Sequence, residues 1–358
     1  MDLKPCSECG VPEVVTSEHL WLNNGDIVHA RAQTSRMVFI ETENLDPLFR
    51  GIAQIIGSEI EHMIITTGRR AERIYFGSFI PEKIREKILN KEMDYELVDA
   101  VFRDLGRLEG VGNVNLVDRR YEQDQNDYDT VSISEPHSVP MAVSAHIGAI
   151  EGLTGVDQGY RYEKVSADTY NVTAFPSPHP EGLSKRMWFK PHHHTDGDIE
   201  LERCSSCGGP RALGGYEWYP ERGIIVNKIT NRRIALQGDA MLNPVFLELE
   251  EELGDVVPGA VVEAQRRFTR SGFYTMEDIT DEGEFRTKLA LMGLGNLKEL
   301  VMRKKGMNMR LDNAALHLIT VGLSQGFFEI GFNVDTTVDW ELSEEGDLQV
   351  EVKPLKYT

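Results

Sequence analysis

Apolar residues recur at helical spacing in two separate stretches of the chain. The first series is Leu45, Leu48, Phe49, Ile52, Ile55 and Ile56, and the second is Leu242, Val245, Phe246, Leu249 and Leu253. This spacing predicts a helix that buries one face. Gly57 and Gly254 follow the two series, where a C-terminal cap is expected.

Strand-like runs surround these helices. A glycine interrupts the β-rich run before each helix, at Gly25 and Gly223, and this pattern predicts a hairpin. Further helices are expected near 81–89, 95–105 and 284–292, and apolar helices near 139–153 and 316–330. Alternating closing strands are expected at 160–165, 171–175, 337–342 and 348–352. Strands, then helices, then strands indicate an α+β fold, with a helical layer on an antiparallel sheet.

Short motifs of the first part of the chain return in the same order in the second part. The pairs are Cys6-Ser7-Glu8-Cys9-Gly10 with Cys204-Ser205-Ser206-Cys207-Gly208, Arg69-Arg70-x-x-Arg73 with Arg266-Arg267-x-x-Arg270, Gly110-Val111-Gly112 with Gly293-Leu294-Gly295, and Gly148-Ala149-Ile150-Glu151 with Gly326-Phe327-Phe328-Glu329. We therefore predict two homologous domains, duplicated with pseudo-two-fold symmetry. Residues 1–178 form the first, 179–199 a linker rich in Pro, His, Gly and Ser, and 200–358 the second.

Composition narrows the class of protein. The chain has 358 residues, 41% of them hydrophobic and 27% charged, which is typical of a globular protein. A net charge of -20 argues against nucleic acid as a partner. No run reaches the roughly 20 apolar residues of a membrane span, so no membrane partner is expected. The start of the chain has no apolar secretion segment, and a cytoplasmic location is expected.

The four cysteines are all accounted for by the two Cys-x-x-Cys-Gly motifs. Two cysteines at this spacing can face one metal ion, and zinc requires four ligands. Cys6, Cys9, Cys204 and Cys207 are therefore predicted to form one closed structural zinc site, within one chain or between two chains of a dimer. The alternatives are a redox dithiol in each half, or no metal at all.

The arginine motif places Arg69 and Arg73, and likewise Arg266 and Arg270, one helical turn apart. They are candidates for a clamp on a ligand carboxylate or phosphate. The favoured interpretation is salt bridges to the abundant acidic residues.

Other side chains are candidates for ligand contacts or metal ligands. His146 and Phe327 lie on the apolar helices and are candidates for a ligand pocket. A place in the core is the favoured interpretation for Phe327, and a place in the core or at a pocket is favoured for His146. The triple histidine His192-His193-His194 is expected to be a solvated loop, with a metal site as the alternative.

The order of motifs resembles that of the vinyl-4-reductase domain, a hydrocarbon-binding family related in fold to haem-nitric-oxide-binding domains. The resemblance rests on the hairpin, the helix ending at glycine, Gly293-Leu294-Gly295-Asn296 and the closing strands through Val352, with a more divergent version from Gly110 to Phe175. It implies a small-molecule-binding domain whose cavity lies between the helices and the sheet. The closing strands lack the cysteines that this family often carries, so the Cys-x-x-Cys loops are a separate feature.

These observations predict a binding or sensory protein for an apolar, aromatic or tetrapyrrole-like molecule, with a zinc site that joins two repeats. No catalytic motif is recognisable, so no catalytic residue is proposed, and a protein other than an enzyme is favoured. The alternatives are a reductase or enzyme accessory factor for such a substrate, and a structural subunit of a larger complex. A homodimer or a protein partner is compatible with each of these functions.

Overall fold

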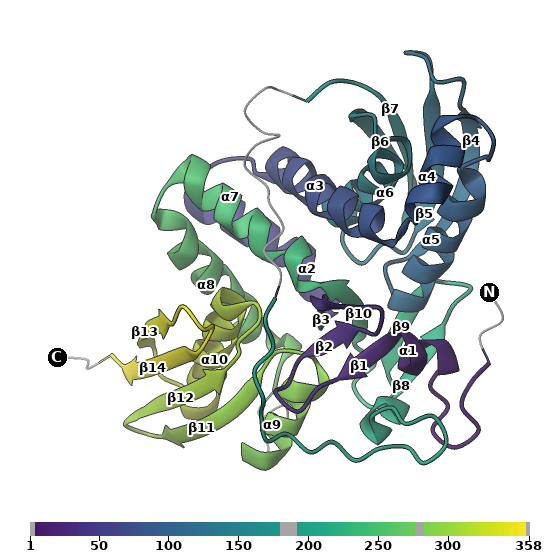
Figure 1. The fold of residues 1–358 in the computed structure, drawn as a ribbon. Coiled ribbons are helices and arrows are strands. Elements are labelled where there is room, and N and C mark those ends of the chain that lie inside the picture. The colour runs from purple at the N-terminus through teal and green to yellow at the C-terminus, as the bar shows by residue number, and fades with distance from the viewer. Residues whose placement is uncertain (1–3, 180–191, 276–281, 356–358) are drawn as a thin grey trace.

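The computed structural model describes residues 4–179, 192–275 and 282–355. We refer to residues 4–179 as the first half and to the remaining described residues as the second half. The chain is α+β, as the sequence predicts (Figure 1). The helices are α1 (Glu13–Glu18), α2 (Thr42–Ile56), α3 (Glu61–Phe79), α4 (Glu82–Leu89), α5 (Glu96–Glu109), α6 (Val139–Thr154), α7 (Asn243–Leu253), α8 (Val256–Phe268), α9 (Glu282–Leu291) and α10 (His317–Phe332).

One sheet takes three strands from each half. Its order is β1-β2-β3-β10-β9-β8, and β3 pairs antiparallel with β10 at its centre. The strands are β1 (His19–Trp21), β2 (Ile27–His29), β3 (Ala32–Glu41), β8 (Tyr216–Tyr219), β9 (Ile224–Asn227) and β10 (Arg233–Gly238). The two predicted hairpins therefore join into a single sheet that belongs to both halves.

Each half also has a four-stranded antiparallel sheet, and the two sheets have the same strand order. The first is β4-β5-β7-β6 and the second is β11-β12-β14-β13. Their strands are β4 (Asn113–Arg120), β5 (Tyr128–Ser134), β6 (Gln158–Ser166), β7 (Thr169–Pro176), β11 (Asn296–Arg303), β12 (Gly306–Asp312), β13 (Thr336–Leu342) and β14 (Leu348–Pro354). Whether the halves are duplicated domains with the predicted boundaries stays a prediction. The polar segment 118–129 comprises the end of β4, a loop over residues 121–127 and the start of β5.

Each hairpin lies against the Gly-x-Gly motif of the other half. Gly110 has φ +81°, and a Cβ atom there would lie 2.7 Å from the Ile234 carbonyl oxygen of β10. Gly293 has φ +77°, and its Cβ would lie 2.5 Å from the Met37 carbonyl oxygen of β3. Glycine is the residue that tolerates both the positive φ and the close approach. The motif thus serves contact between halves as well as a turn.

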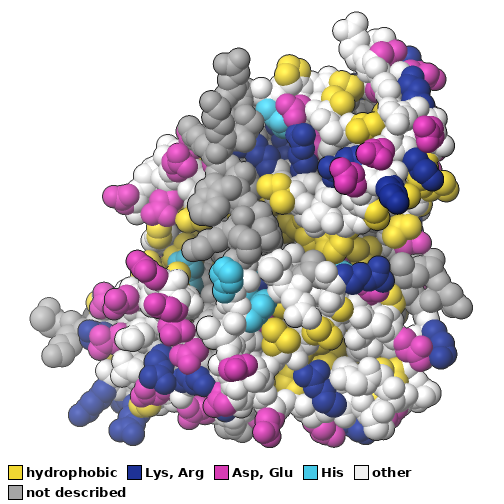
Figure 2. Space-filling model, viewed as in Figure 1, with side chains coloured by type: hydrophobic (Ala, Val, Ile, Leu, Met, Phe, Trp, Pro, Cys, Tyr) yellow, Lys and Arg dark blue, Asp and Glu magenta, His cyan; other side chains and the backbone are white. Residues whose placement is uncertain are grey.

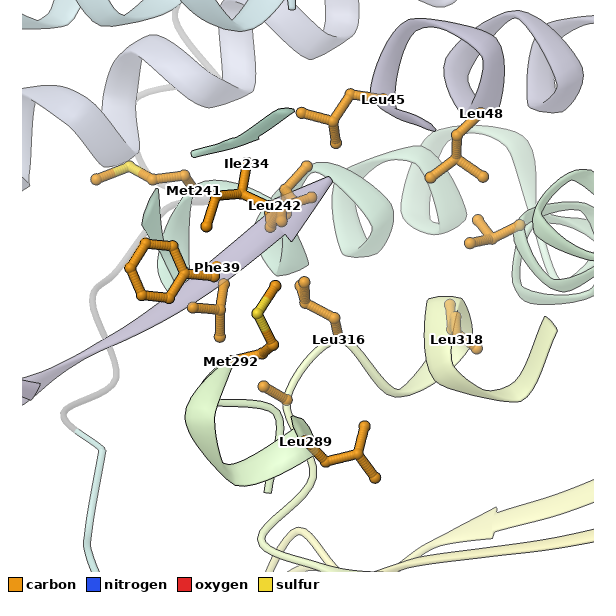
Figure 3. Packing of buried hydrophobic residues seen from close by; sticks show 14 of the residues in the cluster. Phe39, Leu45, Leu48, Ile234, Met241, Leu242, Leu289, Met292, Leu316 and Leu318 are labelled. Carbon is orange, nitrogen blue, oxygen red and sulfur yellow. The ribbon is translucent and has the colours of Figure 1, made fainter. Parts of the chain in front are cut away.

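Helices of the two halves also contact one another, α2 with α8 and α3 with α7. The main core is continuous between the halves. Figure 3 shows Phe39 of β3 beside Met292, which follows α9, with Ile234 and Met241 of the second half nearby. Burial of apolar side chains from both halves favours one cooperative structure. None of the helices in the described residues is sufficiently long and apolar to span a membrane.

Candidate functional site

The four cysteines lie on two loops with the same backbone conformation. The N–H of Gly10 donates to the Cys6 carbonyl and that of Gly208 to the Cys204 carbonyl, both at 2.9 Å. Both glycines have positive φ, 78° and 73°. This tight turn directs both sulfur atoms of a Cys-x-x-Cys pair to the same side.

The two loops bring all four sulfur atoms together within one chain. Cys6 Sγ lies 3.7 Å from Cys204 Sγ, and Cys9 Sγ lies 3.6 Å from Cys207 Sγ. All four sulfurs lie within 4.8 Å of one another, and no cysteine is in a disulfide. A tetrahedral zinc with Zn–S bonds of about 2.3 Å requires S···S distances of about 3.8 Å. The geometry therefore fits a four-thiolate metal site with no open position.

The surroundings act differently on the cysteines, since burial raises the pKa of the Cys9 thiol to about 12. Backbone N–H groups of Cys9 and Glu8 lower the pKa of the Cys6 thiol to about 6. The Glu8 carboxylate reaches the second loop, where it accepts hydrogen bonds from Ser205 Oγ at 2.5 Å and from Arg211 Nη1 at 2.8 Å. A direct contact therefore joins the loops beside the sulfurs.

In the second half, the arginine motif forms intramolecular ion pairs. Arg266 Nε lies 2.9 Å from Glu329 Oε2, and Arg270 Nη1 lies 3.1 Å from the same oxygen. Glu329 is 2% exposed, and its other oxygen accepts hydrogen bonds from the Thr336 N–H and hydroxyl. These ion pairs agree with the salt bridges that the sequence favoured. Both partners lie in the same half of the chain. A role of Arg266 and Arg270 in ligand binding stays a prediction.

In the first half, a histidine joins the corresponding cluster. Arg73 Nη1 lies 2.6 Å from Asp157, and His179 Nε2 lies 2.8 Å from the fully buried Glu151. Arg69 donates to the Gln158 carbonyl and contacts the His179 ring. Burial raises the pKa of Glu151 to about 7. The carboxylates, already close to two guanidinium groups, are poor candidates for a cation site, and a role of Arg69 and Arg73 in ligand binding stays a prediction.

Two histidines of the linker reach a buried aspartate, contrary to the expected solvated loop. His192 Nε2 and His194 Nδ1 lie 3.1 and 2.5 Å from Asp26 Oδ2. Figure 2 shows histidine side chains grouped near the middle of one face. Arg36 Nε lies 2.8 Å from Asp26 Oδ1. Burial opposes ionisation, but the hydrogen bond from His192 and the charge of Arg36 keep the pKa of Asp26 well below its usual value. The contacts hold His192 and His194 against the first half, and since the three ligand atoms lie within 4.8 Å of one another, a metal site here stays a prediction.

A cavity of about 80 Å³ lies between α3, α5, α6 and β10. The walls include the apolar side chains Phe76, Phe102, Ala149 and Met241. Three walls come from helices of the first half, while β10 and Met241 come from the second half. Strand β10 of the second half therefore completes the wall of a cavity that otherwise lies in the first half.

Several buried polar atoms at this cavity have no partner. The Tyr75 hydroxyl, Glu109 Oε1 and Gln237 Oε1 form no hydrogen bond within the described part of the chain. Burial raises the pKa of Glu72 to about 8, and burial and the neighbouring Glu72 raise the pKa of Glu109 well above its usual value. Buried polar groups normally have partners, so the unpartnered ones make this cavity the candidate ligand site.

Of the two remaining candidates, one lies at this cavity. His146 lines it, and its Nε2 lies 3.3 Å from the Asp129 carbonyl oxygen. Phe327 lies in the continuous core, 2% exposed, with its ring centroid 5.4 Å from that of Tyr274. The structure thus places His146 beside the cavity and Phe327 among core side chains.

Comparisons with known proteins give only weak likenesses. No family model matches the chain, and no curated protein matches it. Similar solved structures are H-NOX domains. One, from work on haem distortion in the H-NOX family, is 20% identical with a TM-score of 0.23, over 34% of this chain and 75% of that one. A Cs H-NOX mutant with 4-cyano-L-phenylalanine and a T. tengcongensis H-NOX mutant are each 18% identical, with TM-scores of 0.23 and 0.22, over 33% of this chain and 74% of theirs. At these scores the likeness carries no argument about a ligand.

The buried acids of the cavity were not singled out from the sequence. Glu72 lies inside a charged run, and Glu109 directly precedes a helix-ending glycine, positions that are usually solvated. One signal was present. The motif correspondence matches Glu72 with Thr269 and Glu109 with Met292, so only the first half carries acids at these positions.

Proposed function

We propose that this protein is a ligand-binding, sensory protein that holds a small molecule in the cavity between its halves and a structural zinc ion at its four cysteines. The observation that carries this proposal is the cavity lined by unpartnered buried polar atoms at Tyr75, Glu109 and Gln237. Leaving such groups unsatisfied costs about 1–3 kcal/mol each, so a ligand that satisfies them gains binding free energy.

The position of the cavity suggests how binding could be sensed. Its walls belong to both halves, so a ligand contacts β10 of one half and α3, α5 and α6 of the other. A ligand that binds one relative position of the halves more tightly shifts the population toward it. The signal would then pass to a protein partner through the changed surface.

The volume favours a small ligand. A cavity of about 80 Å³ is smaller than the roughly 150 Å³ cavity that holds benzene and far below the roughly 300–1,000 Å³ of drug-sized pockets. A space of this size favours a ligand much smaller than a tetrapyrrole. The ligand we propose has only a few heavy atoms.

The zinc ion would be held by Cys6, Cys9, Cys204 and Cys207, two sulfurs from each half. When bound, it supplies a cross-link between the halves and leaves no coordination position for a substrate. The direct contact of Glu8 with Ser205 and Arg211 supports the same arrangement of the loops.

Metal analysis and native mass spectrometry of untreated protein, followed by thermal-shift screening of small fragments, test the proposal. We expect one zinc ion per chain and fragments that raise the melting temperature. Ala149→Leu should fill the cavity and abolish the fragment effect without loss of stability, because Ala149 lines empty space. The control Ala264→Leu should destabilise the protein by about 1–3 kcal/mol, because Ala264 packs against Gly51. Fragment effects that survive in Ala149→Leu would contradict the proposal.

A further inference from the structure

Two acidic groups of the cavity, Glu72 and Glu109, have no cationic partner among the described residues. Within the described residues, Glu72 forms no hydrogen bond or ion pair, and Glu109 Oε1 has no partner. Arg103 is the cation at the cavity, but it is paired with Asp99 and with Glu96, whose Oε1 lies 2.5 Å from Arg103 Nη2. Among the described residues that line the cavity, no positively charged side chain is therefore left to neutralise the two glutamates.

The cavity is also rich in hydrogen-bond acceptors. Gln237 contacts the His137 ring through its amide nitrogen, which leaves Oε1 at the cavity without a donor. The Tyr75 hydroxyl is likewise unpartnered and can accept. A group with several N–H donors and a positive charge would satisfy these atoms together.

A metal ion is a poorer match than an organic cation. Hard cations such as Ca²⁺ take six to eight oxygen ligands, and zinc takes four. Neither Glu72 nor Glu109 belongs to a cluster of three ligand atoms lying within 4.8 Å of one another in the described residues. The aromatic rings of Phe76 and Phe102, with centroids 4.6 Å apart, favour a ligand with an apolar body and can stabilise an ammonium group.

We infer that the cavity binds a small primary alkylammonium ion, whose N–H groups donate to Glu72, Glu109 and Gln237 and whose alkyl chain contacts the aromatic wall. This inference rests on the proposed ligand-binding function and names the class of ligand. The size of the cavity suits a chain of about three or four carbons.

The second half offers an internal comparison. The sequence correspondence matches Glu72, Glu109 and His146 with Thr269, Met292 and Ser324. Thr269 and Ser324 are buried with partners, the Gln265 carbonyl at 2.9 Å and Met309 Sδ at 3.7 Å. At these three positions, therefore, only the first half carries acidic side chains that lack a cationic partner.

Binding should release protons. The titratable groups at the cavity are Glu72 and Tyr75 from α3, Asp99, Arg103 and Glu109 from α5, and His146 from α6. Burial raises the pKa of both glutamates, and with a pKa of about 8 Glu72 is protonated at neutral pH without a ligand. A cation favours the carboxylate form, so the glutamates release protons when the cation binds.

Isothermal titration calorimetry of the full chain at pH 7, in two amine-free buffers with different ionisation enthalpies, tests the inference. The probes are n-propylammonium chloride, with 1-propanol and propionate as matched neutral and anionic molecules. We expect propylammonium to bind at least tenfold more tightly than propanol, with net proton release, and propionate not to bind.

Variants separate this inference from the proposed function. Glu72→Gln and Glu109→Gln should each weaken propylammonium binding at least tenfold, while the exposed Glu59→Gln should not change it. Glu109→Met, which carries the second-half residue, should act like Glu109→Gln and guards against a folding defect of one variant, with melting temperature as the check. Equal binding of propanol and propylammonium would refute the inference that the ligand is a cation. The proposed ligand-binding site would still stand. No binding of any probe or fragment would overturn both.

Discussion

The buried carboxyl of Glu72 makes a quantitative prediction about stability. Burial raises its pKa from 4.5 to about 8 in the folded protein. Between these values the unfolded chain has lost the proton while the folded protein keeps it. Stability therefore falls as pH rises through this window and levels off above about pH 8. Substitution Glu72→Gln removes this titration, so the variant should gain relative to the wild type as pH rises.

The magnitude follows from the same pKa. Each unit of pKa difference corresponds to about 1.4 kcal/mol, so the penalty in the wild type reaches about 3–5 kcal/mol above pH 8. For a chain of this length the entropy of unfolding is roughly 0.75 kcal/mol/K, so the variant should melt about 4–7 °C higher than the wild type at pH 8.5. At pH 4 the two should melt within about 1 °C.

Thermal melts at half-unit pH intervals in amine-free buffers are the assay, because an amine buffer could supply the missing counter-ion. Glu59→Gln, an exposed glutamate, is the matched control and should follow the wild-type profile. If Glu72→Gln and the wild type give parallel profiles from pH 4 to 8.5, then Glu72 does not hold a buried proton, and the cavity does not contain a neutral acid at this position.

Three further predictions concern the zinc site, the ion pair of Arg266 with Glu329 and the contact of α3 with α6. Cys6→Ser and Cys204→Ser should each lower the zinc content from one per chain to near zero by metal analysis, whereas Ser7→Ala in the same loop should keep it; full zinc in both cysteine variants would refute the shared site. Arg266→Ala should cost about 3–5 kcal/mol in urea unfolding because it leaves buried Glu329 short of a partner, while Arg267→Ala, 60% exposed, should cost under about 0.5 kcal/mol; equal losses would contradict this. Gly148→Ala should destabilise by at least about 1–3 kcal/mol, since its Cβ would lie 2.4 Å from Glu72 Cβ, and Gly259→Ala, with open space around it, should be neutral or stabilising by up to about 1 kcal/mol; tolerance of both would argue against the close contact of α3 and α6.

Local structure was largely predictable from the sequence. Helix α2 ends at Ile56, and Gly57 has the left-handed conformation that its position predicted. The α+β order of elements follows from the periods of the apolar residues, because each period reports which face of a single element is buried. The closeness of the Cys-x-x-Cys loops followed from the ligand count of zinc.

The partners of these elements were not predictable. Periodicity does not say which strand pairs with β3, and the pairing with β10 joins residues about two hundred positions apart. Glu109 is buried because a hairpin from the other half covers it, a contact that no local pattern reports. The linker histidines were expected in solvent because nothing near them in sequence reveals the buried Asp26.

The pairing of β3 from the first half with β10 from the second half has a consequence for biosynthesis. When residues 1–179 have left the ribosome, one edge of β3 has no neighbour, and the cavity lacks its fourth wall until β10 (Arg233–Gly238) has been made. At about 5–20 residues per second this interval lasts on the order of 3–12 s. During it the nascent chain presents an unpaired strand edge, the kind of surface on which chaperones act and through which two unfinished chains can join.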